Sequence, residues 1–171
     1  MRTADPPTTP AADGGVGPRS NSPATGILVG FVVANLALKL SLVAMGINRG
    51  EYTDGILQLL VFQVKAGLYP PLFGALATAL AATGIELETA GRIVSAVAGS
   101  LGLIPVYMMA LRLRGPCAAR FAALFYTISP MILRWSVRVM TDALFFALCA
   151  AALWLMMEAW AATRDRADRR R

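Results

Sequence analysis

Long apolar stretches with almost no charge limit this chain to folds that can cross a lipid bilayer. The second of them is uncharged from Ile93 to Leu111. Each approaches the roughly 20 helical residues that cross the ~30 Å hydrocarbon core of a membrane. The sequence therefore predicts an all-α membrane protein with about four transmembrane helices plus extracytoplasmic juxtamembrane helices. The four predicted spans cover about residues 24–46, 91–111, 118–135 and 142–161.

Composition and charge placement favour a membrane and argue against nucleic acid. Hydrophobic residues make up 57% of the chain and charged residues 15%, whereas soluble domains carry about a quarter charged residues. The net charge is +6, but basic residues crowd the end that follows the last apolar stretch, where they face lipid headgroups. We expect membrane lipids as partners and no nucleic acid. The crowded residues are Arg164, Arg166, Arg169, Arg170 and Arg171.

The residue types present do not indicate a resident cofactor. Histidine is absent and the two cysteines stand far apart in the sequence, so a zinc site is not expected. Carboxylates are the remaining ligand class, and a divalent cation held by them stays open.

Basic residues also predict the sidedness of the chain. Arg112, Arg114 and Arg120 fall between the second and third apolar stretches, and the arginine-rich end follows the fourth. Four spans put both groups on one side, which the positive-inside rule assigns to the cytoplasm. We therefore predict a multi-pass protein of the plasma (inner) membrane with cytoplasmic termini. Its parts would be a disordered proline-rich tail, a transmembrane module and a basic tail, over residues 1–23, 24–161 and 162–171.

A fifth apolar stretch, residues 66–85, is predicted to lie on the outer membrane surface. Pro71 suits the start of a helix and Gly84 its end, which leaves about 14 residues or about 21 Å. This length is short for a span, and a fifth crossing would force the N-terminal tail to the outer side when the arginine groups are cytoplasmic. We therefore expect a surface helix over 71–84.

A second surface helix is expected over residues 52–66. Four polar residues at helical spacing share one of its faces: Glu51, Asp54, Gln58 and Lys65. This face either turns toward a cavity or lies solvated beside the headgroups, and the periodicity favours neither interpretation.

Three carboxylates are expected at the outer surface. Glu51 and Asp54 lie in the first outer loop, and Asp142 begins the fourth apolar stretch. Acidic residues beside a span are costly unless paired or hydrated, so each is a candidate to take a proton from a hydroxyl. Asp142 has a second interpretation of equal weight, a helix cap paired with Arg138.

Several cations accompany these acids. Arg138, Lys65 and Arg92 are placed to hold a lipid-linked phosphate, since arginine offers forked donors and lysine a compact charge. Lys39 is unusual because it lies inside the first apolar stretch. It either snorkels outward or faces the interior of the helix bundle.

Short motifs follow one another along the chain in a recognisable order. Over about residues 24–160 this order resembles the N-terminal part of GT-C glycosyltransferases. The resemblance is to the protein mannosyltransferase and aminoarabinose transferase group, including the RgtA-to-D-like domain. The motifs are Glu51-Tyr52-Thr53-Asp54, Tyr69-Pro70-Pro71-Leu72, Ala90-Gly91-Arg92-Ile93-Val94-Ser95, Arg112-Leu113-Arg114-Gly115, Ser129-Pro130 and Ser136-Val137-Arg138-Val139-Met140-Thr141-Asp142-Ala143-Leu144-Phe145.

The resemblance implies an enzyme that moves a hexose or pentose from a polyprenyl-phosphate donor to an acceptor hydroxyl. The reaction would occur on the extracytoplasmic face, in protein glycosylation or cell-envelope assembly. Asp54 or Glu51 would be the base, and Asp142 would position the acceptor or the base. The substrate and its phosphate would be held by Arg138, Lys65, Arg92 and Tyr69.

Two features depart from the family pattern. An alignment on Tyr52 places Asn48 where the catalytic aspartate usually stands. Family members are also usually several hundred residues long, with more spans. We therefore expect the N-terminal module of a glycosyltransferase. The alternative is a non-catalytic membrane subunit that needs a partner membrane subunit, or a truncated remnant of such an enzyme.

Overall fold

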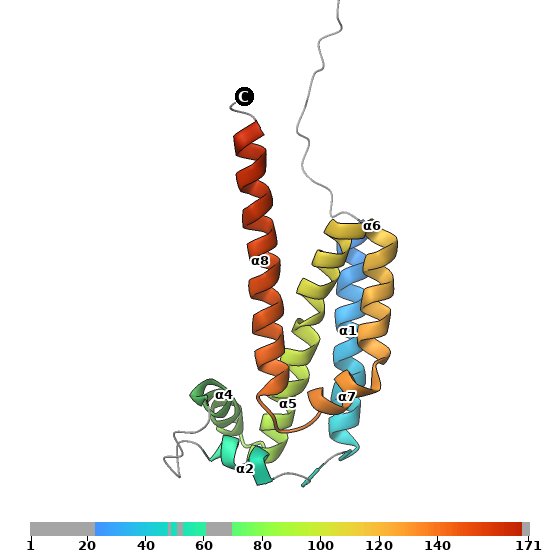
Figure 1. Ribbon diagram of the computed structural model, residues 1–171. Helices are drawn as coiled ribbons and strands as arrows, with labels where there is room; N and C mark the ends of the chain where they lie inside the picture. Colours follow the sequence, from blue (N-terminus) through green and yellow to red (C-terminus); the bar gives the residue numbers. More distant parts are fainter. Residues whose placement is uncertain (1–22, 48, 51–52, 61–69, 169–171) are drawn as a thin grey trace, which may run out of the picture.

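The regular elements of the protein are α-helices wherever its structure is described. The computed structural model describes residues 23–47, 49–50, 53–60 and 70–168. The predicted all-α membrane fold is confirmed, and no strand occurs in this described part. The helices, shown in Figure 1, are α1 (Pro23–Ala44), α2 (Thr53–Leu59), α4 (Pro71–Ala81), α5 (Leu87–Leu101), α6 (Leu103–Ile128), α7 (Pro130–Ser136) and α8 (Asp142–Asp168).

Three helical stretches are long and apolar enough to cross a membrane: Ala24–Ala44, Leu87–Ile128 and Asp142–Arg164. The middle stretch has 42 residues and contains a reversal at Gly115, whose φ of 81° is left-handed and favours glycine. Pro116 then begins the returning helix, as proline suits a first helical turn. The two halves of α6 run side by side in opposite directions (Figure 1), so this stretch contains the second predicted span and the first part of the third.

The third predicted span, 118–135, is not one continuous helix, and the prediction was wrong in this respect. Helix α6 ends at Ile128, and Ser129 is extended, with φ −60° and ψ 116°. Pro130 causes the break because its ring excludes the helical conformation at the preceding residue. Proline then begins α7, a separate short helix that lies at the same end of the bundle as α2 and α4 (Figure 1).

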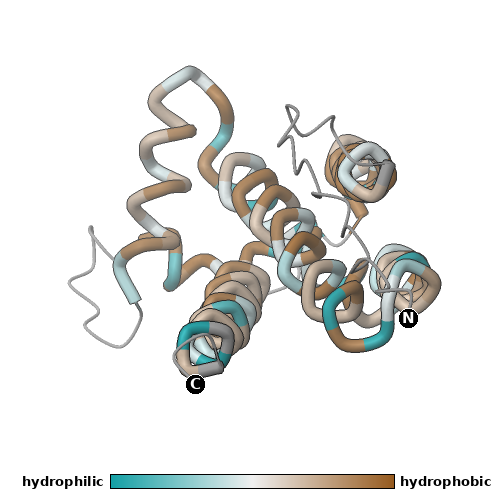
Figure 2. The backbone as a smooth tube through the Cα atoms, turned by 90° about the horizontal axis from the view of Figure 1, so that it is seen from above, coloured by the Kyte–Doolittle hydropathy of each residue, from teal (hydrophilic) through white to brown (hydrophobic). Residues whose placement is uncertain are grey.

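Two short helices lie at that end of the bundle. Helix α4 runs across the bundle axis, as Figures 1 and 2 show together. It buries Phe73 and Ala77 and is followed by a turn at Gly84, whose φ is 95°. The helix therefore stops at Ala81, three residues before the predicted end. Helix α2 covers the start of the predicted 52–66 helix, and residues 61–69 lie outside the described part.

Helix α5 is the centre of the bundle, since it packs against all six of the other described helices. Small residues permit this closeness, as the surroundings of Gly91 and Gly99 show. A Cβ on Gly99 would lie 2.6 Å from Ser136 Oγ, and one on Gly91 would lie 2.8 Å from Leu59 Cδ2. Glycine on this face thus lets α2 and α7 approach the α5 backbone.

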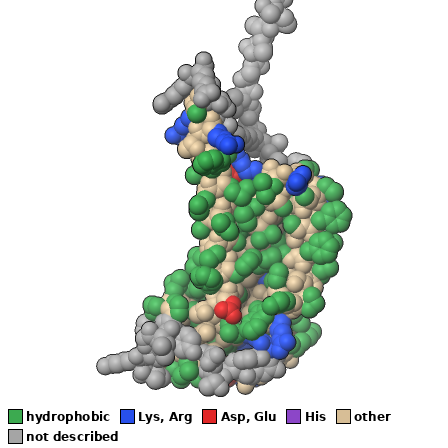
Figure 3. All heavy atoms as spheres, viewed as in Figure 1, with side chains coloured by type: hydrophobic (Ala, Val, Ile, Leu, Met, Phe, Trp, Pro, Cys, Tyr) green, Lys and Arg blue, Asp and Glu red, His purple; other side chains and the backbone are tan. Residues whose placement is uncertain are grey.

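The outside of the bundle is apolar between two charged ends. Hydrophobic side chains cover the middle of the face shown in Figure 3, and Lys and Arg side chains gather toward the ends. At one end Arg112 pairs with Glu158 at 2.9 Å, and at the other Arg49 pairs with Glu86 at 2.7 Å. Both pairs are substantially exposed to solvent, so each contributes little to the stability of the fold.

Replacing Gly99 by valine is expected to destabilise the bundle by about 1–3 kcal/mol, because the new side chain meets Ser136 in a packed interface. The matched control is Gly30→Val in α1, where an added Cβ meets nothing within 4 Å. Thermal unfolding of the detergent-solubilised protein measures both. Equal melting temperatures for the two variants would contradict the packing assigned to α5.

Candidate functional site

The candidate site lies at the end of the bundle that carries α2, α4 and α7. Three of the predicted site residues, Arg92, Arg138 and Asp142, are described there. Helix α2 contains Asp54, but the placement of its side chain is outside the described structure. The other predicted site residues, Glu51, Lys65 and Tyr69, also lie outside the described residues.

Asp142 is the first residue of α8 and its side chain is exposed. The preceding carbonyl, that of Thr141, accepts the amide of Phe145 at 2.8 Å and so starts the helix. A carboxylate in the first turn of a helix interacts favourably with the helix dipole. The structure therefore places Asp142 at a helix N-terminus, as predicted.

Arg92 is buried, with 2% of its surface exposed, and ties two loops to α5. Its Nε donates to the carbonyl of Val137 at 3.0 Å, and its Nη2 donates to the carbonyl of Ile47. The cost of burying a guanidinium is reduced when carbonyl oxygens accept hydrogen bonds from its N–H groups. The sequence suggested a phosphate ligand at this position, and the structure gives Arg92 backbone partners.

The segment between α7 and α8 is held by two further side chains. Ser95 Oγ donates to the carbonyl of Met140 at 3.1 Å, and the amide of Thr141 donates to Gln58 Oε1 at 2.8 Å. Together with Arg92, these residues bind successive backbone groups just before Asp142. The carboxylate is thus positioned by α2 and α5 as well as by its own helix.

Arg138, in the same segment, has 1% of its surface exposed. Its guanidinium carbon lies 5.2 Å from the centre of the Trp135 ring, a distance typical of cation–π contacts. This cation therefore lies inside the protein, beside the Trp135 ring. Sequence reasoning selected Arg138 as a site residue but missed the part played by Ser95 and Gln58. The spacing of Arg92 and Ser95, three residues apart on one helix face, was the available signal.

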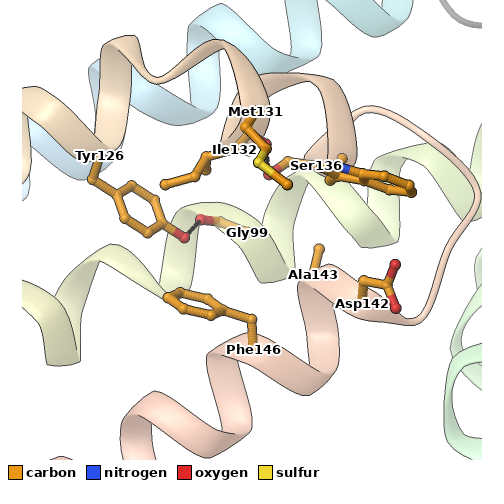
Figure 4. Close-up of a pocket in the computed structure, with 9 residues that line it drawn as sticks. Gly99, Tyr126, Met131, Ile132, Ser136, Asp142, Ala143 and Phe146 are labelled. Atoms are coloured by element: carbon orange, nitrogen blue, oxygen red, sulfur yellow. Dashed lines mark hydrogen bonds between the residues drawn. The ribbon is translucent and has the colours of Figure 1, made fainter.

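A pocket of about 400 Å³ opens beside Asp142 between α5, α6, α7 and α8. Figure 4 shows Asp142 at the end of the pocket opposite Tyr126, with Phe146 between them on α8. Its lining is mainly apolar and comprises Gly99, Tyr126, Met131, Ile132, Trp135, Ser136, Asp142, Ala143 and Phe146.

A smaller pocket of about 160 Å³ lies on the α4 side of Asp142 and is also mainly apolar. It is lined by Pro70, Leu72, Phe73, Thr141, Asp142, Leu144, Phe145 and Leu148. Asp142 belongs to both pockets. One carboxylate is thus presented between two apolar surfaces, an arrangement suited to a substrate with a lipid part and a polar part.

Lys39 faces the interior of the bundle, which the sequence left open. The side chain is fully buried, and its Nζ lies 5.4 Å from the centre of the Tyr126 ring. One helical turn earlier, Asn35 is also fully buried, and its Oδ1 accepts the hydroxyl of Ser100 at 3.0 Å. A polar cluster therefore lies inside the bundle, behind the wall of the larger pocket.

Comparison with known proteins assigns the chain to a family. The family model described as dolichyl-phosphate-mannose-protein mannosyltransferase matches residues 69–167, more than half of the chain. The chain belongs to this family. The resemblance to protein mannosyltransferases is confirmed, and the protein is a membrane glycosyltransferase-like protein. No curated protein and no solved structure matches it. The matched region includes Arg92, Arg138 and Asp142, whereas Glu51 and Asp54 precede it.

Arg92→Met is expected to lower the free energy of unfolding by about 2–4 kcal/mol, because the carbonyls of Ile47 and Val137 lose a charged donor. Arg114→Met removes an exposed arginine and should leave stability unchanged. Chemical or thermal denaturation in detergent compares the two. If Arg92→Met melts like Arg114→Met, the link from α5 to these loops is not stabilising.

Proposed function

We propose that this chain is the N-terminal module of a membrane glycosyltransferase. It moves a sugar from a polyprenyl-phosphate donor to an acceptor hydroxyl on the extracytoplasmic face. The observation that carries the proposal is the exposed carboxylate of Asp142, fixed at a helix N-terminus between two apolar pockets. A polyprenyl chain suits the apolar lining, and a hydroxyl suits the carboxylate.

The positions of basic residues support the outer face as the side of reaction. The reversal of α6 and the end of α8 lie toward the same end of the bundle, opposite the start of α8 at Asp142 (Figure 1). Exposed arginines gather along these two segments, and the positive-inside rule assigns such an end to the cytoplasm. In this orientation both termini are cytoplasmic in the plasma membrane, and Asp142 is extracytoplasmic. The arginines are Arg112, Arg114, Arg120, Arg164 and Arg166.

The proposed reaction needs one base and one stabilised leaving group. Asp54 or Glu51 takes the proton of the acceptor hydroxyl, while Asp142 positions that hydroxyl. The acceptor oxygen then bonds to the anomeric carbon of the sugar as the bond from that carbon to the phosphate oxygen breaks. Polyprenyl phosphate leaves with the electron pair.

Cations stabilise the negative charge that collects on the departing phosphate. Arg138 and Lys65 are the proposed partners, and Tyr69 is proposed to contact the substrate. Arg92 contributes indirectly, because its hydrogen bond to the carbonyl of Val137 fixes the backbone next to Arg138. No further cofactor is part of the proposal.

Asp142→Asn is expected to reduce sugar transfer about 10²-fold, because an uncharged amide does not orient the acceptor hydroxyl as a carboxylate does. The assay follows transfer from a polyprenyl-phosphate sugar in membranes that contain the chain. Glu158→Gln is the matched control, since this carboxylate lies at the other end of the bundle and pairs with Arg112. It should transfer at the unaltered rate.

Asp54→Asn and Glu51→Gln, tested in the same membranes, separate the two candidate bases. The variant with the larger loss of turnover identifies the base. Full activity in both of these variants and in Asp142→Asn would remove the catalytic assignment. Absence of transfer by the unaltered chain, restored by a second membrane protein, would favour the non-catalytic subunit.

Labelling with a membrane-impermeant maleimide tests the orientation. In a Cys149→Ala background, T78C places one thiol on the exposed face of α4, and Cys117 is already exposed beside the reversal of α6. The thiol at 78 should react from outside intact cells. Cys117 should react only after the cytoplasmic side is opened. The reverse pattern would invert the proposed topology.

A further inference from the structure

The polar cluster inside the bundle contains buried hydrogen-bond donors that have no partner in the described part of the chain. Among the described residues, Lys39 Nζ and Asn35 Nδ2 are buried and have no hydrogen-bond acceptor. Nearby, Asn35 Oδ1 accepts the hydroxyl of Ser100, and the carbonyl of Gly99 accepts the hydroxyl of Tyr126 at 2.6 Å. Buried polar groups are nearly always paired in folded proteins. The unpaired ammonium of Lys39 therefore points to an acceptor supplied by a ligand.

The ammonium of Lys39 lies directly behind the wall of the 400 Å³ pocket. A Cβ placed on Gly99 would lie 3.0 Å from Lys39 Nζ and 2.6 Å from Ser136 Oγ. Gly99, Ser136 and Tyr126 all line the pocket. Because Gly99 has no side chain, the ammonium can lie close to this pocket-lining residue. Lysine has a flexible four-carbon stem, so a small rotation carries its charge past this glycine.

The depth of Lys39 suits a lipid headgroup drawn slightly below the membrane surface. The residue is five positions before Ala44, the end of α1 on the side of the site, which is about 7.5 Å along the helix axis. Asp142 lies at the opposite end of the same pocket from Tyr126 (Figure 4). A phosphate near Tyr126 would therefore leave room in the pocket for an attached group to extend toward Asp142.

A purely structural role does not account for this lysine. Packing alone is served better by an apolar side chain of the same length, since a buried ammonium without an anion loses its hydration. The ring of Tyr126 offsets only part of that loss. A ligand anion in contact with Lys39 offsets more, because an ammonium–phosphate contact is a charge-assisted hydrogen bond.

We propose that Lys39 binds the phosphate of the polyprenyl-phosphate lipid, and that the pocket lined by Tyr126, Ile132 and Phe146 holds the first part of its chain. This inference rests on the proposed function and names the residue that holds the donor. In transfer, Lys39 stabilises the phosphate oxygen that retains the bonding electrons when the sugar leaves. It is a substrate-binding cation supplied by α1, from within the bundle.

The test measures binding and does not depend on transfer. Farnesyl phosphate, farnesol and inorganic phosphate are titrated against the whole chain in detergent micelles. For Lys39→Met the affinity for farnesyl phosphate should fall about tenfold or more, because a charge-assisted contact is lost. Affinity for farnesol, which lacks the phosphate, should be unchanged. The melting temperature of the ligand-free variant should stay the same or rise.

Arg134→Met is the matched control, because it removes an exposed cation from α7 at the same end of the bundle. It should bind farnesyl phosphate as the unaltered chain does. An equal loss in Lys39→Met and Arg134→Met would show attraction by net charge alone and overturn the assignment. Unchanged affinity in Lys39→Met would overturn it directly. If inorganic phosphate bound as tightly as farnesyl phosphate, the lipid chain would contribute nothing to binding, and the proposal of a lipid-phosphate site would be wrong.

A photoreactive farnesyl phosphate bound to the unaltered chain gives a test that needs no variant. Its crosslinks should fall on Ile132 and Phe146, and crosslinks confined to the outer face of α1 would overturn the proposal. Loss of transfer in Asp142→Asn with normal binding in Lys39→Met would leave the proposed function standing and remove this site. The opposite pair of results would keep the lipid-phosphate site and remove the proposed reaction.

Discussion

The contact between one face of α5 and the backbone of residues 137–141 is the interaction on which the site depends. Arg92 and Ser95 donate from α5 to the carbonyls of Val137 and Met140. These carbonyls belong to a loop and have no helical partners, so they need donors from elsewhere at a depth where water is scarce. Supplying them from α5 fixes the start of α8. The position of Asp142 therefore depends on α5, a helix that is remote from it in the sequence.

The break at Pro130 is what makes this contact geometrically available. A continuous helix over 118–135 would satisfy its own carbonyls and would carry the following residues onward along the same axis. Because the chain turns at Ser129, α7 packs against α5, with Ser136 next to Gly99, and these two helices form two walls of the larger pocket. The larger pocket arises in the angle between these walls and α8. The same proline thus creates both the loop and the cavity beside it.

Whether a buried polar group has a hydrogen-bond partner depends on its depth in the bundle. At the site end, the guanidinium of Arg92 and the hydroxyl of Ser95 bind backbone carbonyls and are satisfied. Deeper in the bundle, Lys39 and Asn35 retain donors with no acceptor among the described residues. An intramembrane cation without an anion is costly, and such residues mark binding sites. The satisfied groups build the site, and the unsatisfied ones are the part of it that a ligand completes.

The amino-acid sequence by itself determined the membrane class, the reversal near Gly115, the helix start at Pro71 and the location of Asp142 at a helix N-terminus. These features depend on hydrophobic length and on the backbone limits of glycine and proline, which act over a few residues. Only the tertiary structure decided that Lys39 faces inward, that Arg92 binds carbonyls and that α7 stands apart from α6. Each of those outcomes depends on contacts between helices that are tens of residues apart, such as Arg92 with Val137. Periodicity along one helix carries no information about which neighbour will face it.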